Sequence, residues 1–254
     1  MITLSITTCR RFDLFQRTIK SFHENCLDGS DINLIYHFDD SSTEEDRLNM
    51  ETIIKTLFPN SLIRNYRFSS ESFPGKKRHC YIMCEWLNVI KSESSFNFHL
   101  EDDWLFDSKF SLFDLKKFLE NKKQAAYAGV SQFLRDFPDD IQFEVEDNYW
   151  KWYYDPNRGL LENLFLDTKI IEKSGIEGFW CYYINWPYFG FRPGLWDVKK
   201  LENISSMNCD SDLPFELKFA LELSKEYVSY CTIDSVCHHI GDGESSYDLN
   251  NSER

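Results

Sequence analysis

The chain has 254 residues, 42% of them hydrophobic and 17% aromatic, so it can bury a substantial core, and we exclude overall disorder. Its 28 lysine and arginine residues stand against 42 aspartate and glutamate residues, and the formal net charge is −14. A surface with this charge repels the phosphate backbone of nucleic acid, which excludes nucleic acid as a partner.

The first 130 residues alternate between short apolar runs and apolar residues spaced by three and four, which predicts strands that alternate with helices. Thr43 and Asp46 resemble a capping box, and Pro59 closes the helix that this box opens. Strands are predicted at residues 2–6, 32–38, 62–68 and 96–100, and helices at residues 12–26, between Thr43 and Pro59, and at residues 78–90. The segment 69–77 is typical of a loop.

The pattern changes after about residue 130, where aromatic residues cluster between residues 149 and 191 and regular periods are few. This half ends with a predicted helix at residues 214–224, a predicted strand at residues 227–233 and a polar tail from residue 238 onward. No linker rich in proline, glycine or serine is present. We therefore expect one domain over residues 1–254, with halves at residues 1–130 and 131–254.

The order of the elements predicts an α/β fold whose mainly parallel central sheet is flanked by helices. In open sheets of this kind, ligands bind beyond the carboxyl ends of the strands. Polar residues stand at three of these ends: Thr7 follows the first predicted strand, Asp39 the second and Glu101 the fourth. We expect these residues to meet on one polar edge of the sheet.

The sequence lacks both a signal peptide and an uncharged apolar run of about 18 residues, so we expect no transmembrane segment and no secretion by the usual route. Its eight cysteines form no CxxC pair, and in a chain of this size we expect free thiols in a reducing compartment. His79, Cys80 and Cys84 allow a zinc site as the alternative to half-buried helix thiols, but no second cluster completes it.

Three consecutive carboxylates, Glu101, Asp102 and Asp103, lie between two apolar groups. Carboxylates in such a half-buried place repel one another and lose hydration, so they take up protons or bind a cation. A hard divalent ion such as Mg²⁺ or Mn²⁺ prefers oxygen ligands and leaves coordination positions for diphosphate oxygens. The alternative is a solvated turn, and the apolar flanks favour the metal site over it.

Two further groups on the predicted edge allow two interpretations each. Asp39 and Asp40 can accept hydrogen bonds from a nucleobase or a ribose, or form a turn that enters the next helix. Lys76, Lys77 and Arg78 are the densest basic cluster of the chain. They lie at a predicted helix start, which favours a phosphate, and a solvated basic patch is the alternative.

The second half offers two more candidates. His238 and His239 follow the last predicted strand and are either metal ligands or packed side chains. Glu216 has apolar neighbours on a predicted helix, so it is either a general base with a raised pKa or an exposed helix residue. Spacing alone does not decide between these interpretations.

Five segments, taken in order, resemble the GT-A fold glycosyltransferases, similar to family 2 and to small enzymes of large DNA viruses and bacteria. They are the TTCRR loop, the HFDDSS strand end, the GKKRH segment, the HLEDDW segment at the place of the DxD motif, and the final HHIGDG. The resemblance covers most of the chain. It implies a GT-A (Rossmann-like) fold and transfer of a sugar from a nucleotide-diphospho-sugar to an acceptor hydroxyl.

The resemblance also implies the ligands. The nucleoside would be held by Thr7, Thr8, Arg10 and Asp39, and the diphosphate would be approached by Lys77 or Arg78. The donor would be a UDP-sugar, with a GDP-sugar as the alternative, and the acceptor a glycan or glycoprotein that can pack on Trp186 or Tyr188. The location would be cytoplasmic, in the host cytoplasm for a viral protein.

The metal, Mn²⁺ or Mg²⁺, would be bound by Asp103 and Glu101 of the DxD segment and by His239, while Asp102 would help to bind the nucleotide-sugar. Glu216 would match the general base of the inverting members. The sequence departs from the family pattern because its first DxD residue is glutamate and because no ED pair marks the base. The longer Glu101 side chain can bind the metal through water or contact the ribose instead.

Two other functions are compatible with the same residues. A sugar-phosphate nucleotidyltransferase shares the α/β architecture and the carboxylate-bound metal, but it usually has a glycine-rich loop after the first strand, and residues 7–11 contain no glycine. A non-catalytic carbohydrate-binding protein with a degenerate site would bind sugars without a metal. The released product would distinguish the three functions: nucleoside diphosphate for the glycosyltransferase, pyrophosphate for the nucleotidyltransferase, and no product for the binding protein.

Overall fold

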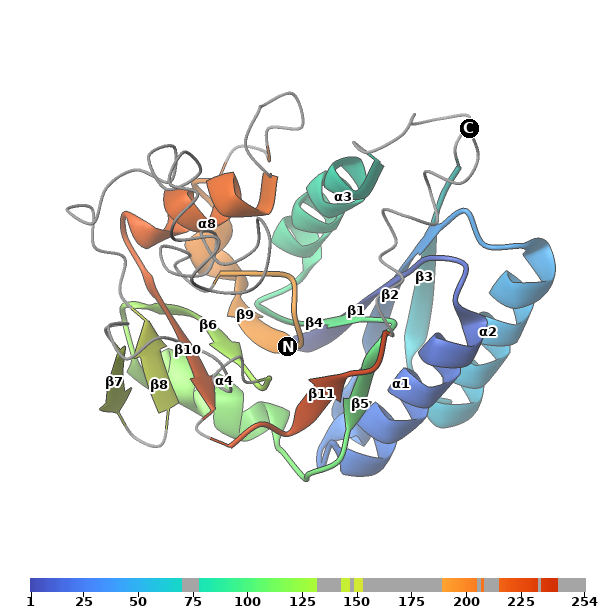
Figure 1. Cartoon of the computed structure of the whole chain (residues 1–254), viewed down its shortest axis with the longest axis horizontal. Coiled ribbons are helices and arrows are strands. Elements are labelled where there is room, and N and C mark those ends of the chain that lie inside the picture. The colour runs from blue at the N-terminus through green and yellow to red at the C-terminus, as the bar shows by residue number, and fades with distance from the viewer. Residues whose placement is uncertain are drawn as a thin grey trace, which may run out of the picture.

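The computed structural model describes residues 1–69, 78–131, 143–146, 149–152, 189–204, 207, 215–232 and 234–241, with the backbone alone at 143–146 and 149–152. The elements up to residue 129 are β1 (Ile2–Thr8), α1 (Phe12–Asn25), η1 (Gly29–Asp31), β2 (Leu34–Asp40), α2 (Glu44–Leu57), β3 (Leu62–Phe68), α3 (Arg78–Glu93), β4 (Phe96–Glu101), β5 (Trp104–Phe106), α4 (Leu112–Asn121) and β6 (Ala125–Gly129). The later elements are β7 (Phe143–Glu146), β8 (Tyr149–Trp152), β9 (Gly194–Asp197), η5 (Val198–Leu201), α8 (Phe215–Ser224), β10 (Val228–Thr232) and β11 (Cys237–His239) (Figure 1).

A nine-stranded sheet in the order β3-β2-β1-β4-β9-β6-β10-β8-β7 runs through the described residues. β3, β2, β1 and β4 pair in parallel, and so do β6 and β10. β9 pairs antiparallel with both β4 and β6, so β4 and β6 point in the same direction. β8 and β7 extend the far edge in antiparallel pairs. The predicted α/β fold with a mainly parallel sheet is confirmed.

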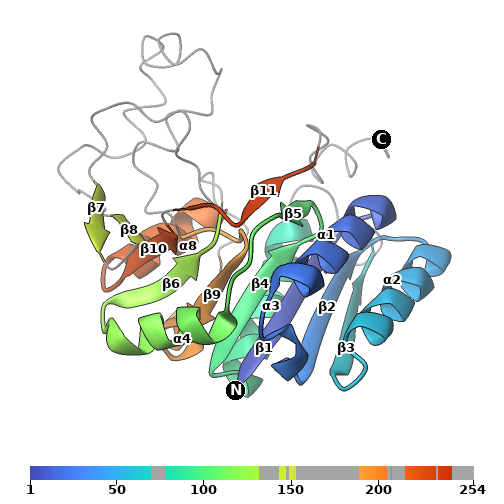
Figure 2. The ribbon, with the colours of Figure 1, turned by 90° about the horizontal axis from the view of Figure 1, so that it is seen from below.

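Helices cover both faces of this sheet and complete three layers (Figure 2). One core lies under α1, α2 and α4 and contains Phe22 and Ile54, together with Leu115 of α4. The other lies under α3 and α8 and contains Trp86 and Phe219. In α1 the apolar residues Phe15, Ile19 and Phe22 are buried. At the start of α2 the Thr43 hydroxyl accepts a hydrogen bond from the Asp46 N–H at 3.1 Å. Local patterning and tertiary packing therefore agree in this half.

The side chains of β1 alternate between these two cores. Leu4 and Ile6 belong to the core under α1 and α2. Ser5 points to the other face, where its hydroxyl donates to Asn97 Oδ1 at 2.7 Å and accepts a hydrogen bond from Trp86 Nε1 at 2.8 Å. Because these polar groups pair with one another, a fully buried strand tolerates a serine beside its apolar residues.

Two expectations for the second half and for the cysteines were wrong. The polar tail expected from His238 onward instead begins inside a strand, because β11 pairs with β5 through Cys237 and Phe106 and through His239 and Trp104. A strand of three residues is too short to show a periodic pattern.

The eight cysteines are not all free thiols, because Cys80 is disulfide-bonded. Cys9, Cys26, Cys84, Cys231 and Cys237 are free. Cysteine spacing does not reveal pairing, so the sequence could not separate Cys80 from the rest. The zinc site considered at His79, Cys80 and Cys84 also loses a ligand, since a disulfide sulfur is not a thiolate. Within the described residues, no helix is both long and apolar enough to cross a membrane.

Candidate active site

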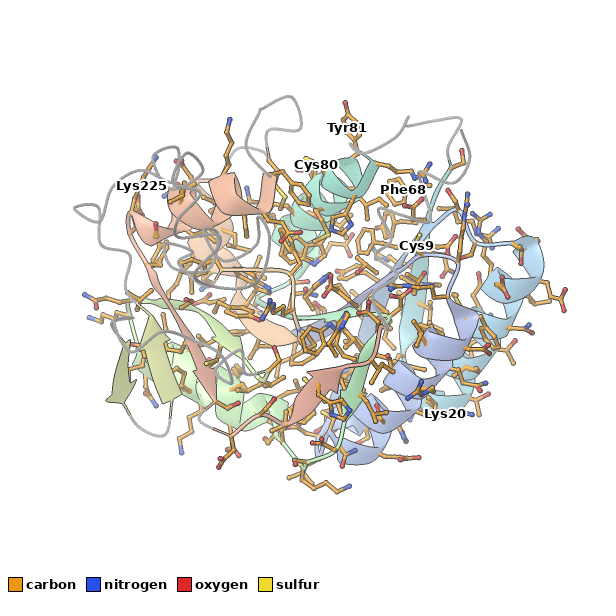
Figure 3. All side chains as sticks on the ribbon, in the orientation of Figure 1. Cys9, Lys20, Phe68, Cys80, Tyr81 and Lys225 are labelled. Carbon is orange, nitrogen blue, oxygen red and sulfur yellow. The ribbon has the colours of Figure 1, made fainter. Side chains whose placement is uncertain are left out.

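The carboxyl ends of β1, β2 and β4 lie side by side and carry the polar residues that the sequence placed there. Thr7 pairs with Glu101 across β1 and β4, and Thr8 pairs with Asp39 across β1 and β2. Cys9 and Phe68, labelled in Figure 3, mark the ends of β1 and β3 on this edge. The parallel register therefore brings residues from distant parts of the sequence to one rim.

Asp39 is buried, and both of its carboxylate oxygens have partners. Oδ1 accepts from the Thr8 hydroxyl at 3.2 Å, while Oδ2 accepts from Arg47 Nε at 2.6 Å and from the Ser42 N–H at 3.3 Å. The Arg10 N–H donates to the Ser42 hydroxyl at 3.0 Å. These contacts connect the loop after β1 to the loop after β2, so Asp39 stabilises the structure of this edge. Its contact with a ligand stays a prediction.

Backbone conformation at these two loops is unusual. Arg10 has φ 53° and Ser41 has φ 61°, both in the left-handed region that residues other than glycine seldom adopt. The Arg10 Nε–H donates to the Ser41 carbonyl at 3.0 Å, so the two residues hold each other in place. Such conformations persist where the surrounding contacts fix them, and they cluster at functional sites.

Arg78 begins α3 and is almost completely buried. Its Nε lies 2.6 Å from Asp40 Oδ1, and only 2% and 6% of the two side chains are exposed. Its predicted partner, the diphosphate, would therefore meet a guanidinium that already pairs with a carboxylate. Lys77 lies outside the described residues.

The middle residue of the acidic segment, Asp102, joins the loop after β1 to the turn after β4. It accepts a hydrogen bond from the Cys9 N–H at 2.9 Å and forms an ion pair with Arg11. Its carbonyl accepts from the Thr18 hydroxyl at 2.9 Å. Burial raises the pKa of Asp102 to about 7, although the charge of Arg11 acts in the opposite direction.

Asp103 and His239, the two residues that the family resemblance implied as metal ligands, lie in contact. His239 Nε2 lies 3.1 Å from Asp103 Oδ2, and the same oxygen accepts from Arg11 Nη1 at 2.8 Å. The main chains also join here, since the Ile240 N–H donates to the Asp103 carbonyl at 2.8 Å. Burial acts to raise the pKa of Asp103, but the hydrogen bond with His239 and the charge of Arg11 outweigh it, and the pKa is lowered.

The second carboxylate oxygen of Asp103 has no partner. Oδ1 is buried and makes no hydrogen bond within the described residues. A buried carboxylate oxygen without a donor is costly, because it has lost water and gained nothing in return. A cation at this oxygen would remove that cost, so Asp103 and the adjacent imidazole of His239 fit an ion that takes oxygen and nitrogen ligands.

A complete metal-binding group is not formed by the described side chains. Among the described residues, no three or more His, Cys, Asp or Glu side chains lie close enough together to hold an ion. Glu101 instead accepts a hydrogen bond from Trp104 Nε1 at 3.1 Å. Its position as a third ligand stays a prediction, and diphosphate oxygens or water would have to complete the coordination.

Glu101 and Glu216 form a second acidic pair on the same edge. Burial raises the pKa of Glu101 to about 8, with the charges of Asp103 and Glu216 acting in the same direction. Burial also raises the pKa of Glu216 to about 7. His79 Nε2 lies 3.8 Å from Glu216 Oε1, and burial lowers the pKa of His79 to about 4, so its imidazole is neutral at pH 7.

Sequence reasoning missed two cations of this site. Arg11 pairs with Asp102 and Asp103, although the family resemblance implied a role only for its neighbour Arg10. Arg192 lowers the pKa of both Glu101 and Glu216 through its charge. Arg192 lies two residues before Gly194, the first residue of β9. Gly194 pairs with His99 of β4, which lies two residues before Glu101. No periodic signal announces β9, so only the structure places Arg192 here.

No protein family and no curated protein matches this sequence, whereas solved structures match its fold. S. aureus TarS 1–349 in complex with UDP has a TM-score of 0.56 at 11% identity, with 93% of this chain and 59% of that chain covered. The mannosyltransferase PcManGT from Pyrobaculum calidifontis in complex with GDP-Man and Mn²⁺ has a TM-score of 0.56 at 13% identity, with 99% and 61% covered. TarS 1–349 in complex with UDP-GlcNAc has a TM-score of 0.54 at 11% identity, with 96% and 62% covered.

This chain spans about three fifths of the length of these proteins. At such low identities the likeness concerns the fold, and the expected resemblance to the GT-A fold glycosyltransferases is confirmed at that level.

Proposed function

We propose that this chain is a glycosyltransferase that moves a sugar from a nucleotide-diphospho-sugar to an acceptor hydroxyl, with a divalent metal, Mn²⁺ or Mg²⁺. The observation that carries the proposal is the buried, unpartnered Oδ1 of Asp103, which lies beside His239 at the ligand-binding edge of a GT-A sheet. Asp103 and His239 would hold the metal, with Glu101 as a further ligand. The metal would neutralise the charge that builds on the departing nucleoside diphosphate.

Residues on the β1 and β2 side of the edge would bind the donor. Thr7, Thr8, Arg10 and Asp39 would hold the nucleoside, and Asp102 would keep the loop after β1 in place through the Cys9 N–H. Lys77 or Arg78 would approach the diphosphate. Since the structural neighbours were solved with UDP, UDP-GlcNAc and GDP-Man, a UDP-sugar is the favoured donor and a GDP-sugar the alternative.

Glu216 would act as the general base, which implies inversion at the anomeric carbon. Its carboxylate would accept the proton of the acceptor hydroxyl as the acceptor oxygen forms a bond to the anomeric carbon and the bond to the diphosphate breaks. The electrostatic interactions of Glu216 with Glu101 and Arg192 support this role. The acceptor would be a glycan or glycoprotein. The aromatic candidates Trp186 and Tyr188 lie outside the described residues.

The test is a thermal-shift screen of UDP- and GDP-sugars with and without Mn²⁺, followed by analysis of the released nucleotide. A donor at about 100 times its Kd should raise the Tm by about 5 °C or more, because it binds the native state alone. Asp103→Ala should abolish the Mn²⁺-dependent shift and keep the fold, as circular dichroism would check. A shift that survives this substitution would remove Asp103 from the site.

The product separates the competing functions. Nucleoside diphosphate supports glycosyl transfer, whereas pyrophosphate would identify a sugar-phosphate nucleotidyltransferase. Sugar binding that persists without Mn²⁺, together with an absence of donor hydrolysis, would indicate a non-catalytic carbohydrate-binding protein. The cytoplasmic location expected from the sequence stays a prediction.

A further inference from the structure

Arg11 lies between the two aspartates of the acidic segment. It is the last residue before α1, and its guanidinium contacts Asp102 with one terminal nitrogen and Asp103 Oδ2 with the other, the latter at 2.8 Å. The side chain of Arg11 is 12% exposed, and those of Asp102 and Asp103 are 1% and 9% exposed. A buried arginine that bridges two buried carboxylates is held in a defined geometry rather than sampling solvent.

The two carboxylate oxygens of Asp103 have different surroundings. Oδ2 receives Arg11 and His239, while the buried Oδ1 has no partner among the described residues. A metal at Asp103 would therefore meet one available oxygen, and a full positive charge would already lie on the same carboxylate. Like charges that share a carboxylate repel one another, and burial weakens the screening of that repulsion by water.

We propose that Arg11 is a built-in competitor of the divalent cation at Asp103. Without metal, Arg11 supplies the positive charge that lets two adjacent aspartates remain buried. With metal, it keeps Asp103 a one-oxygen ligand and opposes the ion. The free protein therefore binds the metal weakly, and the metal enters together with the nucleoside diphosphate, whose oxygens complete its coordination and whose negative charge offsets Arg11. This inference rests on the proposed function, since it takes the metal site of Asp103 as given.

The test measures binding of Mn²⁺ alone to the nucleotide-free full chain, by electron paramagnetic resonance of the unbound ion. Arg11→Met and Arg11→Gln remove the charge, and each should bind Mn²⁺ about tenfold more tightly than the unsubstituted protein. Arg11→Lys retains the charge and should stay within about threefold of the original affinity. The glutamine variant keeps a hydrogen-bond donor, so it remains informative where the methionine variant fails to fold.

Arg17→Met is the matched control, because Arg17 is an exposed arginine on α1, the helix that Arg11 precedes, and its removal changes the net charge equally. It should leave Mn²⁺ affinity unchanged. Unchanged or weaker Mn²⁺ binding by both neutral Arg11 variants would overturn the inference. A gain in affinity that Arg17→Met reproduces would also overturn it, because the effect would then come from net charge.

A second series separates failure of this inference from failure of the proposed function. Asp103→Ala should abolish Mn²⁺ binding in the original protein and in the Arg11→Gln background. If Asp103→Ala leaves binding intact, the proposed metal site itself is wrong. If it abolishes binding but the Arg11 variants gain no affinity, the metal site stands and the competition by Arg11 is refuted.

Discussion

Glu216 differs from an ordinary helix glutamate because burial raises its pKa to about 7 and because it interacts with Glu101 and Arg192. If it accepts the acceptor proton, Glu216→Gln should lower kcat by about 10²- to 10⁴-fold, since glutamine keeps the shape but cannot take a proton. Donor binding, measured by the Mn²⁺-dependent thermal shift, should change little. Steady-state release of nucleoside diphosphate in the presence of acceptor would measure the loss.

Glu222→Gln is the control for this substitution. Glu222 lies on the same helix, is exposed and pairs with Lys225, so its neutralisation should leave kcat unchanged. An equal kcat for the original protein and Glu216→Gln would remove Glu216 from proton transfer and leave the base unassigned.

Gly241 is packed against the proposed metal ligands. A Cβ at this position would lie 2.9 Å from Asp103 Oδ2 and 3.0 Å from His239 Cε1. Asp103 is held by His239 and by Arg11, so the added methyl group of Gly241→Ala should displace its carboxylate. We expect Mn²⁺-dependent donor affinity to fall by about tenfold, with less than about 1 kcal/mol lost from the free energy of unfolding.

Isothermal titration with the donor and chemical denaturation measure these two quantities. Gly190→Ala is the control, because a Cβ there meets no atom within 4 Å. If Gly241→Ala binds the donor as tightly as the control, the close approach at Asp103 has no functional consequence.

Some residues of the candidate site could be predicted from the sequence, and others could not. Asp103 was recognisable because two further acids and apolar flanks surround it, and its contact with His239 followed from a resemblance that aligned both segments. Arg11 was not recognisable, since adjacent arginines offer no clue as to which one turns inward. The residue before it, Arg10, has a left-handed backbone that is held by contacts with Ser41 and Ser42, and local sequence does not reveal such tertiary contacts.

At the scale of elements, Asp28 fixes the start of α4. Its carboxylate accepts hydrogen bonds from the N–H groups of Leu112 and Phe113, both at 2.8 Å, and from the Ser111 hydroxyl at 2.7 Å. Since Asp28 lies three residues after Asn25, the last residue of α1, it joins two helices that are distant in sequence. Asp28→Ala should lower the free energy of unfolding by about 1–2 kcal/mol, the usual cost of a lost helix cap.

This stabilisation should depend on pH with a definite sign. Burial acts to raise the pKa of Asp28, but the hydrogen bonds from Phe113 and Leu112 outweigh it and lower the pKa. The stabilisation is therefore complete above the unfolded pKa of about 3.9 and is lost as the pH falls below it. Urea denaturation of the original protein and of Asp28→Ala should show a smaller difference at pH 3 than at pH 6, whereas a constant difference would contradict the charged cap.

The elements themselves were predictable to different degrees. Strands β1, β2 and β4 and the helices that follow the first three strands reflect local patterns, because these strands contain short apolar runs and each helix buries one face. β9 and β11 carry no such pattern, since they are four and three residues long. Their positions are decided by pairing with β4, β6 and β5, which a reading of local sequence does not reveal.

At the scale of the whole molecule, the charge of −14 and the proposed binding of a diphosphate are compatible. Arg10, Arg11, Arg78 and Arg192 gather at or near the polar edge, so the potential there can differ from that of the surface as a whole. The fold class followed from the alternation of elements, and the GT-A architecture followed from the resemblance. The sequence could not show that β6 joins the same sheet as β1 to β4, because that depends on the pairing of β9 with both β4 and β6.

The antiparallel insertion of β9 has a consequence for synthesis on the ribosome. Until residues 194–197 have emerged, β4 and β6 lack the strand that separates and joins them, and each presents an open edge with unpaired backbone groups. For more than sixty residues after β6 ends at Gly129, the nascent chain must therefore carry a four-stranded half-sheet that is open at β4, together with β6 as a strand without its partners. Chaperone demand should be greatest in that interval, and it should drop once this one short strand closes both edges at once.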